Sequence, residues 1–183
     1  MTLKSKRFAA LLLTIIMIVS LASCGQTGTK DKASNDSHDV VLDLFASNYS
    51  VLAVSNLVDR FQTMSQYTAI RVTYDEPAML AAKIEAGYDC DIFICEVPSC
   101  MDWLDGTKTG EANPNKNNLL NSDSRKQVFK GFPDGYTSDA DLVYEIAVTK
   151  KADETEEIEK FIDFITSENA DKAYEGSGFS RIQ

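Results

Sequence analysis

Residues 40–64 read VVLDLFASNYSVLAVSNLVDRFQTM and contain a strand, a turn and a helix in succession. The first seven residues, 40–46, are mostly apolar, as in a buried parallel strand. Residues 47–50 are polar and supply the chemistry of a turn and a helix cap. The apolar residues that follow recur at helical spacing: Val54, Leu57, Val58, Phe61 and Met64. The stretch therefore predicts a buried strand that leads into an amphipathic helix.

The rest of the chain repeats this alternation of strands and helices. Residues 70–74, 92–95 and 142–148 predict three further strands. Helices are predicted to start at Pro77 and Pro98, since proline suits the first helical turn, and an apolar stripe predicts another over residues 158–165. Such alternation is typical of right-handed βαβ units. The sequence thus predicts an α/β fold with a mostly parallel sheet flanked by helices.

Residues 1–23 have the pattern of a secretory signal peptide. A basic start precedes an apolar run of about a dozen residues, which is too short to span a bilayer as a helix. The run ends in LASCG at residues 21–25, which resembles a bacterial lipobox. By this resemblance Cys24 carries the lipid that anchors the chain in the cell membrane, facing outside the cytoplasm. A plain signal peptide or a transmembrane anchor with an incidental cysteine is the alternative.

Residues 24–38 predict a lipid-anchored flexible tether, because they contain no large apolar side chain. His38, the single histidine of the chain, ends this tether and is interpreted as a solvated linker residue rather than a metal ligand. Residues 39–183 then form the predicted α/β lobe. Within it, residues 105–141 are predicted to be rich in loops.

Charge and residue usage exclude two classes of function. The formal net charge is −10, and without residues 1–23 the chain has 15 basic and 28 acidic residues. Such a chain repels phosphate backbones, so we expect no nucleic-acid partner. A serine or cysteine nucleophile would lack its base because the only histidine lies in the tether, and no phosphate-loop glycine pattern occurs. We therefore expect no enzyme activity, no cofactor and no metal site.

Several segments resemble, in the same order, those of one protein family. They are FASNYS at 45–50, CDIFI at 90–94, MDWL at 101–104, LNSDSR at 120–125 and the tail from Tyr144 to Ile182. Together they resemble the molybdate-binding periplasmic solute-binding proteins of ABC importers. The resemblance implies one lobe of a two-lobed Venus-flytrap fold and a substrate-binding lipoprotein. Molybdate, tungstate or another small solute would be its ligand, and an ABC permease its partner.

The resemblance also implies where a ligand would bind. The family holds a tetrahedral dianion with serine hydroxyls and with backbone N–H groups at helix N-termini. The corresponding turns here comprise Ser47, Asn48, Tyr49 and Ser50, and Asp75 and Glu76. Two family serines are replaced by Glu76 and Pro77, and a carboxylate beside a dianion costs about 1–4 kcal/mol. This departure implies that oxyanion binding is weakened or lost.

Each of these two turns also has other interpretations. Residues 47–50 are also consistent with helix capping alone. Asp75 and Glu76 are consistent with a site for a cation or an amine, or with a solvated loop at a helix N-terminus.

A second departure from the family lies between Arg125 and the last long strand. There the family has a second lobe of roughly a hundred residues, whereas this chain has only the 16 residues 126–141, too few for a core. Residues 105–141 are therefore interpreted as a remnant of the inter-lobe region and second lobe. The alternative functions are a non-transport surface interaction lipoprotein and a degenerate single-lobe fragment.

Three further cysteines, Cys90, Cys95 and Cys100, follow one another at intervals of five residues. This spacing matches no common zinc or redox motif. Cys90 and Cys95 would point to opposite faces of an extended strand, too far apart to bridge. A Cys95–Cys100 disulfide across the strand-to-helix turn and buried free thiols remain the two alternatives.

Overall fold

The computed structural model describes residues 40–105, 118–133, 141–153 and 155–183. These residues belong to one compact unit, Ser37–Gln183. The predicted signal peptide, the tether, Cys24 and His38 lie outside the described residues, as does much of the segment 105–141.

Six strands form one sheet in the order β2-β1-β3-β5-β4-β6. β1 pairs in parallel with β2 and β3, β5 is antiparallel to β3 and β4, and β6 is antiparallel to β4. The strand bounds are β1 (Val40–Ser47), β2 (Thr68–Asp75), β3 (Ile92–Cys95), β4 (Leu120–Gly131), β5 (Leu142–Thr149) and β6 (Phe179–Arg181). The predicted α/β class is confirmed.

The sheet is mixed, whereas the sequence predicted a mostly parallel one. The difference arises in the second half of the chain, where β4 and β5 follow each other and pair directly. Only ten residues, 132–141, connect them. Parallel neighbours need a crossover of a dozen or more residues, so a connection this short joins antiparallel strands.

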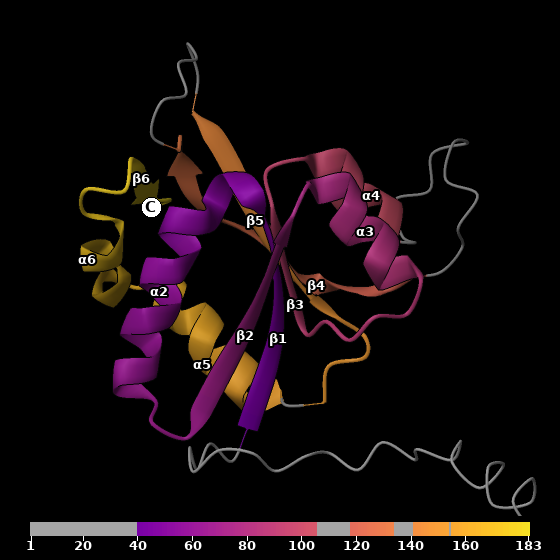
Figure 1. Cartoon of the computed structure of the whole chain (residues 1–183), viewed down its shortest axis with the longest axis horizontal. Coiled ribbons are helices and arrows are strands. Elements are labelled where there is room, and N and C mark those ends of the chain that lie inside the picture. Colours follow the sequence, from indigo (N-terminus) through magenta and orange to yellow (C-terminus); the bar gives the residue numbers. More distant parts are fainter. Residues whose placement is uncertain (1–39, 106–117, 134–140, 154) are drawn as a thin grey trace, which may run out of the picture. The chain divides into compact units, whose positions relative to one another are not determined.

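The helices cover both faces of the sheet (Figure 1). Buried residues of α2, α5 and α6 share one hydrophobic cluster with the sheet, and those of α3 and α4 share the other. The bounds are η1 (Asn48–Ser50), α2 (Val51–Met64), α3 (Pro77–Glu85), α4 (Pro98–Leu104), α5 (Thr155–Thr166), η2 (Glu168–Ala170) and α6 (Asp171–Tyr174). Within the described ranges, no helix has the length and apolar character needed to cross a membrane.

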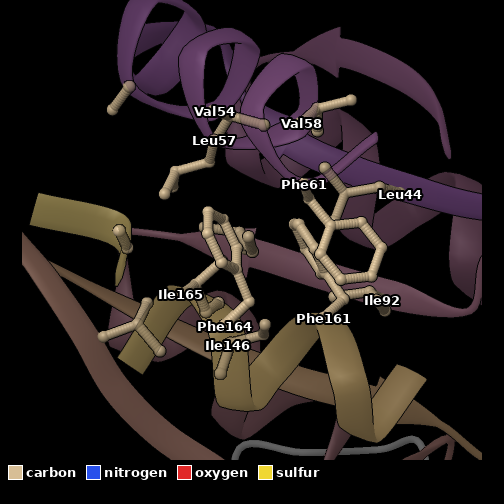
Figure 2. Close-up of a cluster of buried hydrophobic side chains, with 14 of the residues drawn as sticks. Leu44, Val54, Leu57, Val58, Phe61, Ile92, Ile146, Phe161, Phe164 and Ile165 are labelled. Carbon is tan, nitrogen blue, oxygen red and sulfur yellow. The ribbon is translucent and has the colours of Figure 1, made fainter. Parts of the chain in front are cut away.

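The larger cluster lies where α2 and α5 meet over the sheet (Figure 2). Phe61 of α2 meets Phe161 of α5 edge to face, with ring centroids 5.1 Å apart, and Phe164 packs beside them. Leu44, Ile92 and Ile146 contribute from β1, β3 and β5. Both apolar stripes predicted from the sequence therefore face the core, except for Met64, which is exposed at the end of α2. This packing holds the start of α2 at the end of β1.

β4 is the element that the sequence analysis missed, since its residues lie in the segment predicted to be rich in loops. Only Leu120, Val128, Phe129 and Gly131 of its twelve residues are buried. Its pairing with β5 shifts register twice, between Asn121 and Lys126 and again between Gln127 and Phe129. Such irregularities interrupt the two-residue alternation by which a strand is recognised.

The backbone before β6 approaches the residue after β4 closely at Gly178, and this contact predicts a difference between two alanine substitutions. Gly178 has φ +80°, and a Cβ there would lie 2.5 Å from the Phe132 carbonyl oxygen. Gly176 has φ +73°, and a Cβ there would meet nothing within 4 Å. We expect Gly178→Ala to lower the free energy of unfolding by about 2–3 kcal/mol and Gly176→Ala by about 1 kcal/mol. Urea denaturation measures both, and equal losses would contradict the close approach.

Candidate functional site

The two turns singled out from the sequence lie side by side in the structure. Ser47, the last residue of β1, is the register partner of Asp75, the last residue of β2. η1 and α2 follow the first strand, and α3 follows the second, so these helices begin at the same edge of the sheet (Figure 1). The carboxyl edge of parallel strands is where α/β proteins place their ligands.

The turn at residues 47–50 is held by its own hydroxyl groups. Ser47 Oγ accepts a hydrogen bond from the Tyr49 backbone N–H (3.2 Å), and Ser50 Oγ donates to the Ser47 carbonyl (2.7 Å). Both serines are fully buried, whereas Asn48 and Tyr49 are exposed. The Ser50 hydroxyl thus already uses its one hydrogen in a bond to the backbone. The Ser47 hydroxyl caps the helix and still has a proton to donate.

The turn at residues 75–77 has two carboxylates, of which one is paired with a lysine and the other is exposed. Asp75 accepts hydrogen bonds from Lys83 Nζ (2.8 Å) and from the Glu76 backbone N–H (2.9 Å). The Lys83 contact, and then the backbone contact, hold the pKa of Asp75 below its ordinary value. Glu76 is exposed at the start of α3 and makes no capping hydrogen bond, and Pro77 has no N–H to offer.

Two further polar residues, Glu96 and Tyr144, reach this edge and were missed in the sequence analysis. Cys95 of β3 is the register partner of Glu145 of β5, so one step further along the strands Glu96 lies opposite Tyr144. Glu96 Oε2 and the Tyr144 hydroxyl are both buried without a hydrogen-bond partner. The signal that could have found Glu96 is a charged residue directly after an apolar strand.

Tyr144 is fully buried. Its ring stacks on Phe129 of β4, with centroids 4.7 Å apart. Burial raises the pKa of Tyr144, and the nearby Glu96 carboxylate and Tyr49 hydroxyl raise it further. The phenol therefore stays protonated at neutral pH and can donate its hydrogen bond.

The three cysteines of the lobe are free thiols, so the Cys95–Cys100 disulfide is not formed. The Cys95 thiol instead donates to the Val97 carbonyl (3.4 Å), and the Cys90 thiol donates to the Ile92 carbonyl (3.2 Å). The prediction that Cys90 and Cys95 face opposite sides is wrong, because both belong to the cluster with α3 and α4. The strand begins only at Ile92, so its alternation does not extend to Cys90.

The difference in burial predicts which thiol reacts first. Cys90 and Cys95 are buried, and burial strongly raises the pKa of each thiol. Cys100 is partly exposed, and its pKa is raised chiefly by burial and then by Glu96. We expect iodoacetamide at mildly alkaline pH to modify Cys100 at least about tenfold faster than the other two, because the reactive species is an accessible thiolate. Peptide mass spectrometry measures the rates, with the urea-unfolded chain as control, and equal rates at Cys95 and Cys100 in the folded protein would contradict this.

The site is not assembled from metal-ligating residues of the usual kinds. In the part of the chain that the structure describes, no group of three or more histidine, cysteine, aspartate or glutamate residues could hold a metal ion. What the edge does offer is hydroxyl groups, two unpaired buried polar atoms and one exposed carboxylate. These groups suit a small solute held by hydrogen bonds.

Comparisons with known proteins agree with this fold. Residues 115–180 match the family model described as bacterial extracellular solute-binding protein. No curated protein sequence matches the chain.

Three solved structures of binding proteins have a similar fold over most of the chain. A protein described as the substrate-binding domain of a molybdenum ABC transporter from Clostridium difficile has a TM-score of 0.62 at 16% identity, covering 79% of this chain and 100% of that one. The periplasmic molybdate-binding protein of Azotobacter vinelandii has a TM-score of 0.61 at 10% identity, covering 78% and 100%. Iron-bound HitA from Pseudomonas aeruginosa has a TM-score of 0.55 at 12% identity, covering 79% and 87%.

These similarities show that the lobe has the fold of a periplasmic solute-binding protein. The first two structures are of molybdate-type proteins, so the fold that the sequence resemblance implied is confirmed. At these identities the solved structures establish the fold, and the solute of this chain is a separate question.

Proposed function

We propose that this chain is an extracytoplasmic solute-binding lipoprotein of an ABC importer, anchored through Cys24 and descended from an oxyanion receptor. The observation that carries the proposal is the register of Ser47 with Asp75, which brings both candidate ligand turns to one edge at the starts of two helices. A small solute held there, between residues 47–50 and residues 75–76, would be passed to a membrane permease. Molybdate or tungstate is the solute that the family resemblance supports.

The contacts at this edge support the view that oxyanion binding is weakened. The Ser50 hydroxyl already donates a hydrogen bond to the backbone, and Pro77 has no backbone N–H to donate. Lys83 is occupied by Asp75, so its charge is not available to an anion. Glu76 adds an exposed negative charge where the family has a neutral donor. A dianion therefore meets fewer donors and more repulsion than the serine-lined site of the family.

A thermal-shift titration of residues 25–183 tests the proposal, with molybdate, tungstate, sulfate, phosphate and small organic solutes as ligands. We expect at least one solute to raise the melting temperature by a few degrees near saturation. Glu76→Ser should strengthen molybdate binding by about tenfold, since removing the charge relieves a repulsion of about 1–4 kcal/mol. Glu159→Ser makes the same charge change at an exposed position on α5 and serves as the matched control. A melting temperature that no solute changes in either variant would contradict the proposal.

A second candidate function, docking of another copy of the chain, is favoured by the apolar residues exposed at the same edge. These are Tyr49 in η1, Val51 and Leu52 at the start of α2, and Met79 in the first turn of α3, each 38–52% exposed. A second lobe would cover this edge in the two-lobed family, and a dimer could restore such a cleft. Analytical ultracentrifugation tests this, because Met79→Glu should abolish self-association. A monomer at all concentrations would rule out this candidate.

A further inference from the structure

Four buried side-chain atoms have no hydrogen-bond partner among the described residues, and two of them belong to residues that follow β3 and lie opposite it on β5. These two are Glu96 Oε2 and the Tyr144 hydroxyl, and Tyr144 is fully buried as a residue. Folded proteins satisfy almost all buried polar groups, because each one left unpaired costs roughly 1–3 kcal/mol. Two such groups in register with each other, at the edge where α2 and α3 begin, therefore point to a missing ligand.

The strand register brings the two groups together. β3 and β5 are antiparallel, with Ile94 opposite Ile146 and Cys95 opposite Glu145, so the next residues, Glu96 and Tyr144, lie opposite each other. Ile94, Ile146 and Tyr144 all belong to the cluster on the α2 side of the sheet. By strand alternation, Glu96 extends from that same face.

The site opens toward solvent at the turn after β1. β1 is parallel to β3, with Ala46 opposite Ile94, so the turn at residues 47–50 and Glu96 follow these strands at the same edge of the sheet. Tyr49 follows, 38% exposed, and Glu96 is itself partly exposed. Glu96 is thus partly open to solvent at this edge, while its Oε2 atom and the Tyr144 hydroxyl are buried.

The unpaired groups define the chemistry of this solute. A carboxylate accepts hydrogen bonds and donates none, so the group that reaches Glu96 Oε2 must be a donor. The Tyr144 hydroxyl can donate or accept, and the face of an aromatic ring such as Tyr49 attracts a cation. An oxyanion offers only acceptors to Glu96. An oxyanion would also be repelled by the negative charge of Glu96. The cations Lys83 and Arg125 are already paired with carboxylates and would not offset this repulsion.

We propose that Glu96 and Tyr144 form the floor of the solute site and select a small organic solute that carries a protonated amine. This inference rests on the proposed function, since it names the ligand class of the same edge. Glu96 holds the ammonium group, Tyr144 adds a hydrogen bond from behind, and the ring of Tyr49 lies toward solvent. The neutral remainder of the solute extends toward the turn at residues 75–77.

The experiment is an NMR titration of ¹⁵N-labelled residues 25–183, which contain the whole compact unit. Ethylammonium chloride is the probe, with sodium chloride and sodium molybdate at matched ionic strength as comparisons. We expect ethylammonium to cause saturable shifts of the backbone amides at residues 48–50, 96 and 144–145. Sodium chloride should cause none.

Two variants test the roles of the floor residues. Glu96→Gln should weaken ethylammonium binding by at least about tenfold, as expected for losing a hydrogen bond to a charged group. Glu159→Gln makes the same change at an exposed position on α5 and should leave the affinity for ethylammonium unchanged. Tyr144→Phe should weaken binding and leave the melting temperature of the free protein equal or higher, because an unpaired hydroxyl stabilises nothing in the absence of solute. A purely structural hydroxyl would instead lower the melting temperature.

The outcomes separate this inference from the proposed function. Undiminished ethylammonium binding by Glu96→Gln would overturn the role of Glu96. Saturable shifts of the edge amides with molybdate alone would overturn the amine class while supporting solute binding at the edge. If neither probe nor any solute of the thermal-shift panel perturbs these amides, both proposals fail.

Discussion

Replacing Arg125 with methionine is expected to lower the free energy of unfolding by about 3–5 kcal/mol. The Arg125 side chain is only 10% exposed and makes ion pairs with Glu145 (2.7 Å) and Asp102 (2.5 Å). It thereby links β4 to β5 and to α4. Without the guanidinium, the carboxylate of Glu145, itself 17% exposed, is left without its cation in a largely desolvated place. Most of the loss comes from that stranded charge.

Urea denaturation measures this loss, and the chain provides a matched control. Lys130 also lies in β4 and pairs with Asp141 (3.5 Å), but both side chains are about half exposed. Lys130→Met should therefore cost less than about 1 kcal/mol. Adding Glu145→Gln to Arg125→Met should recover part of the loss, since it removes the stranded charge. Equal effects of the Arg125 and Lys130 substitutions would contradict the buried network.

Replacing Phe129 with alanine is expected to lower the free energy of unfolding by about 3–5 kcal/mol as well. Phe129 is fully buried and stacks on Tyr144, and its ring meets Phe179 edge to face at 5.8 Å. It therefore packs β4, β5 and β6 against one another. Alanine would leave a cavity that these strands cannot close without shifting their register.

The same denaturation experiment on Tyr88→Ala provides the comparison. Tyr88 is 60% exposed, so its truncation should change the free energy of unfolding by no more than about 0.5 kcal/mol. Amide hydrogen exchange adds a local measurement, because Phe129→Ala should lower protection in β4 and β6 first. If Phe129→Ala were as mild as Tyr88→Ala, β4 would be a surface loop, as predicted from the sequence.

The elements with regular patterns were predictable from the chain alone. Residues 40–46 and 92–95 are uninterrupted apolar runs, and the stripes on α2 and α5 recur at helical spacing, so each was recognised within a few residues of its observed bounds. β4 was not recognisable, because its few buried residues are separated by polar ones and by two shifts of register. β6 has only three residues and owes its place to pairing with β4.

The candidate site, too, could be predicted only in part from the sequence. Ser47 and Asp75 could be placed at one edge from the sequence, because each ends a predicted strand and parallel strands end together. Glu96 and Tyr144 could not be paired, since they lie 48 residues apart and the order β3-β5 is visible only in the sheet. The hydrogen bond that the Ser50 hydroxyl donates to the Ser47 carbonyl is likewise a property of the folded turn.

The sequence by itself determined the α/β class, the main strands and helices, and the resemblance to a solute-binding lobe. It could do so because these depend on local periodicity and on short segments in a fixed order. Tertiary structure alone decided the mixed sheet, the burial of Arg125 between two carboxylates, and the meeting of Glu96 with Tyr144. Those features depend on which distant strands pair and in what register, and that choice is made by the packing of the whole core.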